Sequence, residues 1–145
     1  MDKKQSEEIL AEIYRNAQLA LTSIADITPQ VDDHETRTEL AAQHEEYERF
    51  AAKAAVIAKD RGIELKEPNA FKKVMMWGSI KMNTLTDNSR SHIAEMMLQG
   101  TVMGIAALRA SKTDSFETAS DEIISLLDEM IEAEERFEKR WKSFI

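Results

Sequence analysis

The chain has 145 residues, of which 27 are acidic and 19 are basic, so its formal net charge is −8. This surplus of negative charge repels nucleic-acid phosphates, and no nucleic-acid partner is expected. The absence of cysteine excludes disulfides, thiolate metal sites and cysteine nucleophiles.

Two further features of the composition concern membranes and secondary structure. No apolar run approaches the roughly 20 residues of a spanning helix, and the first residues lack the apolar core of a signal peptide. We therefore expect a cytoplasmic protein with no membrane partner. The 4 glycines and 2 prolines leave few positions for sharp turns, and no strand-like alternation occurs. Residues 1–145 are expected to form one all-α domain.

The first predicted helix runs from about Lys4 to about Asp26. Its apolar residues recur at three- and four-residue spacing and form one stripe, which contains Ile9, Ile13, Ala17, Ala20, Ile24 and Ile27. The helix is expected to end at Thr28, because Pro29 disfavours helical backbone in the residue before it.

The second predicted helix begins after Asp32 or Asp33, either of which can cap it, and ends at Arg61 and Gly62. Glycine suits the left-handed conformation that follows many helices. The inward stripe mixes polar and apolar residues, namely Leu40, Gln43, Tyr47, Phe50, Ala54 and Ile57.

The region after Pro68 is the least regular part of the chain. Asn69 can cap a short extra helix. An unbroken helix from Asn69 to Ala110 would be about 60 Å long, longer than its neighbours, so a break is expected between Leu85 and Ser89. The third main helix should then run from about Asn88 to about Ala110. Its inward residues are predicted to be Leu98, Val102, Ile105 and Leu108.

A polar turn at residues 111–114 leads to the last predicted helix, which runs from about Phe116 to about Ser143. Its inward stripe again includes one charged residue among apolar ones, and contains Ile123, Leu127, Met130, Glu134, Phe137, Trp141 and Phe144.

The lengths of the connections predict the topology. Short connections at residues 27–32 and 111–115 indicate two antiparallel helical hairpins. Residues 62–87 are far more than a hairpin needs, and they can cross the length of the bundle, partly as a helix. One long crossover between two hairpins is the ferritin-like four-helix arrangement, which we favour. The alternative is an up-down-up-down bundle with a long middle loop.

Polar residues lie on or beside every predicted stripe. They are Asn16 in the first helix, Gln43 and Tyr47 in the second, His92, Glu95 and Gln99 in the third, and Glu134 in the fourth. A buried carboxylate without a partner costs several kcal/mol, so Glu95 and Glu134 should be paired, protonated or metal-bound. Counted from the centres of their helices, Glu95 and Glu134 lie at the same height along the bundle. The crossover topology places Gln43 at that height as well. We therefore predict one polar network in mid-bundle.

Two interpretations of this network remain open. One is a purely structural set of hydrogen bonds. The other is a small-ligand site, or a site for iron or manganese whose candidate ligands are His92, Glu95, Glu134 and Glu46. Ferritin-like di-iron sites combine two glutamates with two Glu-x-x-His motifs. No such motif occurs, although His92 and Glu95 have its spacing in reverse order.

The predicted connector helix carries Met75, Met76 and Trp77 outside the bundle. We expect these side chains to contact a second copy of the chain in a homodimer. Gly100 and Gly104, in the third helix, form a Gly-x-x-x-Gly pair, which allows close approach of a neighbouring helix or leaves room for a bulky side chain such as Trp141.

The stretch from Lys81 to Ile105, KMNTLTDNSRSHIAEMMLQGTVMGI, resembles that of an uncharacterised small bacterial family of the ferritin-like superfamily. The similarity extends to residues 14–16, residues 43–50 and Glu134. It implies a four-helix bundle with a long crossover. It implies no activity, and iron storage and ferroxidase activity are not carried over, because the full di-iron ligand set is absent.

These observations predict a non-catalytic, self-associating bundle that can hold a small ligand or a metal at its polar network. The first alternative is a degenerate di-metal oxidoreductase of ferritin-like type. The second is a stress- or spore-associated structural protein.

Overall fold

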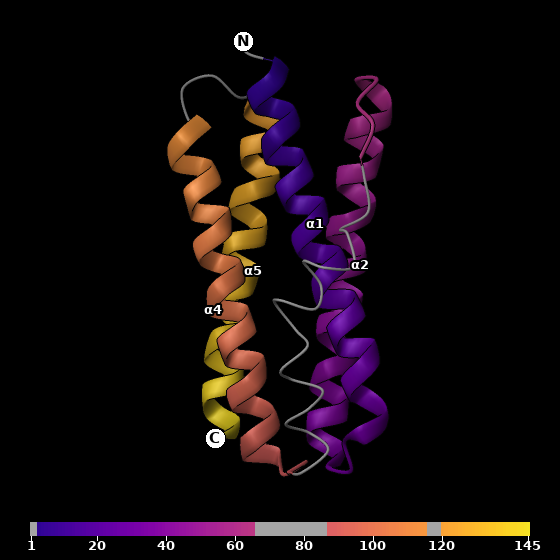
Figure 1. Ribbon diagram of the computed structural model, residues 1–145, viewed down its shortest axis with the longest axis vertical. Helices are drawn as coiled ribbons and strands as arrows, with labels where there is room; N and C mark the ends of the chain where they lie inside the picture. The colour runs from indigo at the N-terminus through magenta and orange to yellow at the C-terminus, as the bar shows by residue number, and fades with distance from the viewer. Residues whose placement is uncertain (1–2, 66–86, 116–119) are drawn as a thin grey trace.

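The computed structural model describes residues 3–65, 87–115 and 120–145, and these ranges form four long helices (Figure 1). The helices are α1 (Lys3–Ile27), α2 (His34–Asp60), α4 (Arg90–Ser115) and α5 (Asp121–Phe144), and a short 3₁₀ turn, η1 (Thr28–Gln30), follows α1. The described ranges contain no strand, which confirms the all-α prediction for them. None of the described helices is long and apolar enough to cross a membrane. The predicted connector helix, with Met75, Met76 and Trp77, lies outside the described residues.

Helix α1 has nearly the predicted bounds, and every residue of its predicted stripe is buried. At its end the Thr28 hydroxyl donates to the carbonyl of Ile24 at 2.6 Å. Pro29 lies at the start of η1, and Val31 then takes an extended conformation. The turn is therefore set by the proline, as the sequence predicted.

Helix α2 is fixed at both ends by local hydrogen bonds. Asp33 is its N-cap, because its carboxylate accepts from the backbone N–H of Thr36 at 3.0 Å and from the Thr36 hydroxyl at 2.7 Å. At the other end Gly62 has a φ of +67°, and the N–H of Ile63 donates to the carbonyl of Ala58 at 2.8 Å. This is a Schellman motif, which confirms the predicted glycine stop. Each residue of the predicted stripe is buried.

The boundary between α4 and α5 differs from the predicted one. Helix α4 continues past Ala110 to Ser115, so the predicted turn at residues 111–114 is wrong. Helix α5 begins at Asp121 and not at Phe116, and Ser120 caps it by accepting from the N–H of Ile123 at 3.3 Å. Residues 111–119 contain neither glycine nor proline, so nothing in that sequence stops α4 at the predicted point.

The inward face of α4 also differs in part from the prediction. Ile105 and Leu108 are buried, Leu98 is half-buried, and Val102 is 45% exposed. The predicted inward position of Val102 is therefore wrong. By contrast, all seven residues of the predicted α5 stripe are buried.

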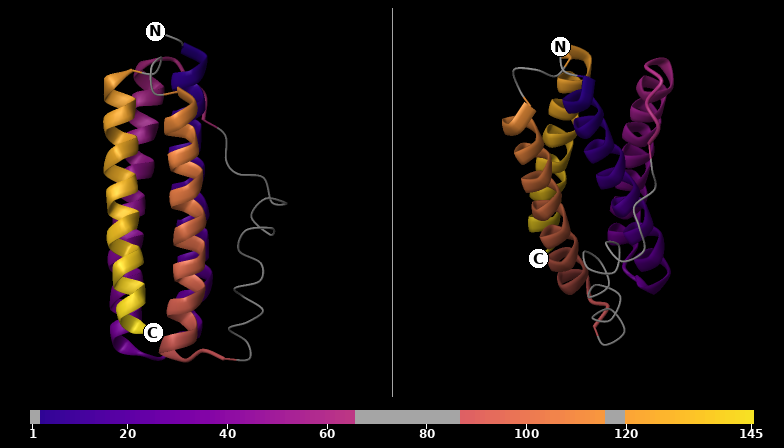
Figure 2. Two further views of the ribbon diagram at one scale, coloured as in Figure 1. Left: turned by 90° about the vertical axis from the view of Figure 1, so that its left-hand side faces the viewer. Right: turned by 45° about the horizontal axis from the view of Figure 1, so that its top comes forward.

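Two helical hairpins, α1 with α2 and α4 with α5, pack against each other mainly through α1 and α4 (Figures 1 and 2). Near the C-terminus of the chain, Arg90 of α4 pairs with Glu35 of α2 at 2.9 Å, so these two helices begin at the same end. At the opposite end Arg61 pairs with Glu122 at 2.8 Å. Helices α2 and α4 therefore point one way, and α1 and α5 point the other way.

Candidate functional site

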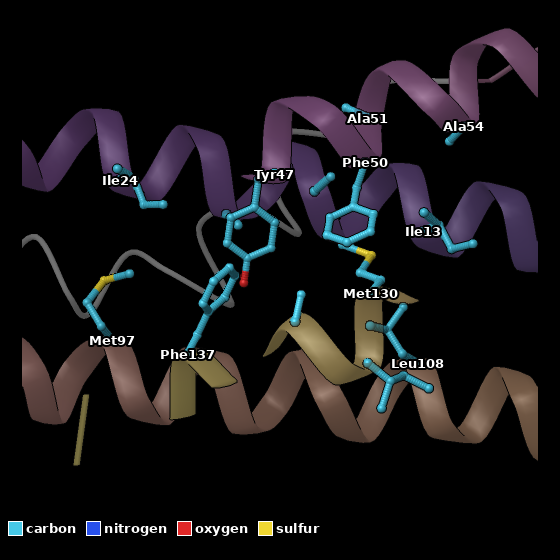
Figure 3. Packing of buried hydrophobic residues seen from close by; sticks show 14 of the residues in the cluster. Ile13, Ile24, Tyr47, Phe50, Ala51, Ala54, Met97, Leu108, Met130 and Phe137 are labelled. Atoms are coloured by element: carbon cyan, nitrogen blue, oxygen red, sulfur yellow. The ribbon is translucent and has the colours of Figure 1, made fainter. Parts of the chain in front are cut away.

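Glu134 of α5 is the only carboxylate that is buried among the described residues, with 1% of its surface exposed. The Tyr47 hydroxyl of α2 donates to its Oε2 at 2.6 Å, and Asn16 Nδ2 of α1 lies 3.4 Å from its Oε1. Figure 3 shows the Tyr47 hydroxyl pointing into the interior beside Phe137, whose ring centroid lies 5.4 Å from that of Tyr47. Side chains from α1 and α2 therefore converge on one carboxyl group of α5.

Helix α4 completes this site with a glycine. The Asn16 amide donates to the carbonyl of Gly104 at 3.1 Å. A Cβ atom at position 104 would lie 3.0 Å from Glu134 Oε2 and 3.1 Å from both polar side-chain atoms of Asn16. Glycine therefore lets the α4 backbone approach the carboxyl group, and the three atoms nearest to this Cβ position belong to Glu134 and Asn16 rather than to Trp141. We call Asn16, Tyr47, Gly104 and Glu134 the Glu134 cluster.

Burial changes the protonation of this cluster. It raises the pKa of Glu134 from 4.5 to about 8, although the hydrogen bonds from Tyr47 and Asn16 oppose the rise. Burial and the neighbouring Glu134 carboxyl also raise the pKa of Tyr47 well above its ordinary value. At neutral pH both groups therefore carry their protons and the cluster is uncharged. A neutral carboxyl avoids the large cost of an unpaired buried charge.

Gln43 belongs to a second network, closer to the C-terminus of the chain. Its Oε1 accepts from the indole N–H of Trp141 at 3.1 Å, and its Nε2 donates to Glu39 at 2.9 Å. Arg140 pairs with the same Glu39 at 2.9 Å. The single predicted network is thus two, one around Glu134 and one around Gln43. The indole bond to Gln43 was not predicted, although both residues lie on predicted inward stripes.

The remaining predicted site residues lie elsewhere. Glu95 and Gln99 are exposed, so the prediction that they face inward is wrong. Glu46 pairs with Arg49 at 2.7 Å on the surface of α2. His92 is half-buried; its Nδ1 lies 4.0 Å from Asp87, and its buried Nε2 has no hydrogen-bond partner among the described residues.

The four predicted metal ligands are therefore not brought together. Within residues 3–65, 87–115 and 120–145, no three histidine or carboxylate side chains are placed to hold a metal ion. Both Glu134 oxygens already accept hydrogen bonds from Tyr47 and Asn16, and the side of α4 is closed by Gly104. The residues present do not fit the di-iron centre of ferritin-like proteins, which needs carboxylates from four helices.

Two neighbouring hollows lie along α2 on the side that faces α5. One hollow, of about 520 Å³, is lined by Ala52, Val56 and Ile57 of α2 and by Leu126 of α5. A second, of about 720 Å³, continues along α2 past Gln43 to Glu39. The two hollows share Arg49 and Ala52, and we call them together the α2/α5 groove.

Comparison of the chain with protein-family models, curated proteins and solved structures finds no match.

Proposed function

We propose that this protein is a non-catalytic helical bundle that acts by self-association and binding at its surface. The observation that supports this most strongly is the state of Glu134. Its oxygens are occupied by donors of the same chain, and the close approach of Gly104 leaves no room beside it. A catalytic or metal-binding carboxylate needs access to a substrate or an ion. The interior therefore serves stability, and the α2/α5 groove is available for binding.

We also propose that the fold is ferritin-like. Support comes from the common direction of α2 and α4, because parallel neighbours in sequence need a connection that runs the length of the bundle. Helix α2 has 27 residues and is about 40 Å long. Asn88, just before α4, donates to the carbonyl of Gln30 at 2.9 Å, beside the start of α2. A single long crossover, as in ferritin-like bundles, joins such ends.

Elemental analysis tests the non-catalytic proposal against the oxidoreductase alternative. The untagged protein would be purified without chelators, exposed to ferrous iron or manganese in air, and desalted. We expect far less than one ion per chain in the wild type and in Glu134→Gln alike, with both proteins folded by circular dichroism. One or two ions per chain, lost in Glu134→Gln and retained in the surface control Glu129→Gln, would overturn the proposal.

A further inference from the structure

The α2/α5 groove is lined in part by apolar side chains. Ala52 and Val56 of α2 are exposed at its edge, whereas Ile57 and Leu126 form its floor and are only 9% and 4% exposed. Val56 is 59% exposed, the highest value for a large apolar side chain among the described residues. Contiguous exposed apolar surface that is rimmed by charge is typical of a protein–protein contact.

The charges along the two walls of the groove alternate in sign. Near Val56 the α2 wall is basic and the α5 wall is acidic, with Lys53 3.4 Å from Glu129 and Arg61 2.8 Å from Glu122.

Towards Glu39 the signs are reversed. The α2 wall carries Glu45, Glu46 and Glu48, and α5 contributes Arg140, which pairs with Glu39 at 2.9 Å. Along the groove from Glu39 to Val56, the charge of the α2 wall therefore changes from acidic to basic. Over the same length the charge of the α5 wall changes from basic to acidic.

This arrangement makes the face complementary to itself. A two-fold axis places the same patch of two subunits together, so each contact occurs twice. If the axis runs along the groove, the basic half of one α2 meets the acidic half of the partner's α5. We propose that the α2/α5 groove is the surface through which two copies of this chain associate, with Val56 of each copy entering the partner's groove. This inference rests on the self-association proposed above and names its site.

The size of the face sets the expected strength of the dimer. From Glu39 to Ile57 the groove extends about 27 Å, and two adjacent helices are about 20 Å wide. The face is therefore about 500 Å² per chain, or about 1,000 Å² in all, at the lower limit for a specific interface. Exposed ion pairs add little, so the exposed apolar side chains of the groove, chiefly Val56, must supply most of the affinity. A dissociation constant in the micromolar range is expected.

Sedimentation velocity from about 1 to about 500 μM tests the proposal with a matched pair of variants. Val56→Lys places a charge in the groove, whereas Val102→Lys makes the same change at a 45% exposed valine of α4. We expect Val56→Lys to raise the dissociation constant of the dimer about tenfold or more, and Val102→Lys to leave it unchanged. Equal effects, or an effect of Val102→Lys alone, would overturn the assigned surface while self-association stands.

Cross-linking provides a second measurement that does not depend on weakening the dimer. The chain has no cysteine, so Ser125→Cys introduces one thiol at the groove, and Ser91→Cys introduces one on the exposed start of α4. A short bis-maleimide should link Ser125→Cys chains into dimers far faster than Ser91→Cys chains. A monomer at every concentration, with no selective cross-link, would overturn both the surface and self-association. Dimers with cross-linking only through Ser91→Cys would overturn the surface alone.

Discussion

Replacing Glu134 by glutamine isolates the effect of the buried carboxyl group. Glutamine has the same shape and keeps an oxygen that can accept from the Tyr47 hydroxyl, which lies 2.6 Å away in the native protein. The substitution removes the titration, although its amide nitrogen then takes the place of Oε1, which lies 3.4 Å from Asn16 Nδ2. It therefore measures how strongly burial opposes ionisation at this position.

The sign of the effect follows from the direction of the pKa shift. The pKa of Glu134 is raised to about 8 by burial, from 4.5 in the unfolded chain. Between these values the folded state holds a proton that the unfolded state has lost, so the free energy of unfolding falls as pH rises. The slope is roughly 1.4 kcal/mol per pH unit, and the total loss is about 4–5 kcal/mol. Above pH 8 the loss is complete.

The assay is urea unfolding followed by circular dichroism at half-unit intervals from pH 5 to pH 9. Near pH 5 the wild type and Glu134→Gln should differ by less than about 1 kcal/mol, because both groups are then neutral. Near pH 9 the variant should be more stable by several kcal/mol. Taking the difference between the two proteins cancels the titration of all other groups.

A matched control removes one surface carboxylate. Glu95→Gln changes an exposed residue of α4 and should follow the wild type at each pH. The reasoning is refuted if the difference between wild type and Glu134→Gln stays constant from pH 5 to pH 9. A constant difference would mean that the carboxyl ionises as easily in the folded protein as in the unfolded chain.

Substitutions at three further positions test the two polar networks and the N-cap of α5, each by urea unfolding at pH 7. Gly104→Ala should destabilise by about 1–2 kcal/mol, because its Cβ would lie 3.0 Å from Glu134 Oε2 and the overpacking outweighs the gain in helix propensity. Gln43→Leu should cost about 1–3 kcal/mol, since it leaves the buried indole N–H of Trp141 without its acceptor, and the indole fluorescence should change in parallel. Ser120→Ala should cost about 1 kcal/mol by removing the N-cap of α5, whereas Ser120→Asp should retain most of the stability. An unchanged free energy of unfolding in any of the three would contradict the corresponding contact.

The helices and their buried faces could be predicted because they depend on local patterns. The α2 cap at Asp33 and the stop at Gly62 follow from single residues whose conformational preferences are strong. The stripe that includes Glu134 followed from its spacing alone, although a charged residue on an apolar stripe is unusual. The inward faces of α1, α2 and α5 were therefore correct. Helix α4 was harder because apolar residues such as Val102 also lie on its outer face.

The α4 neighbour of Glu134 could not be predicted, because facing pairs in a hairpin depend on where the loop lies. Helix α4 ends, and α5 begins, about five residues later than predicted. In an antiparallel hairpin this shift places each residue of α5 opposite a residue of α4 that lies about ten positions later than the expected one, or about 15 Å further along the helix. Glu134 was therefore expected beside Glu95 and lies against Gly104. That displacement changes the chemistry. Two carboxylates at one level would call for a metal ion or a shared proton, whereas one carboxyl beside a glycine and an asparagine can remain neutral. An error of about one and a half turns in the predicted position of a helix end was therefore enough to suggest a metal site where the structure has a hydrogen-bonded, structural carboxyl group.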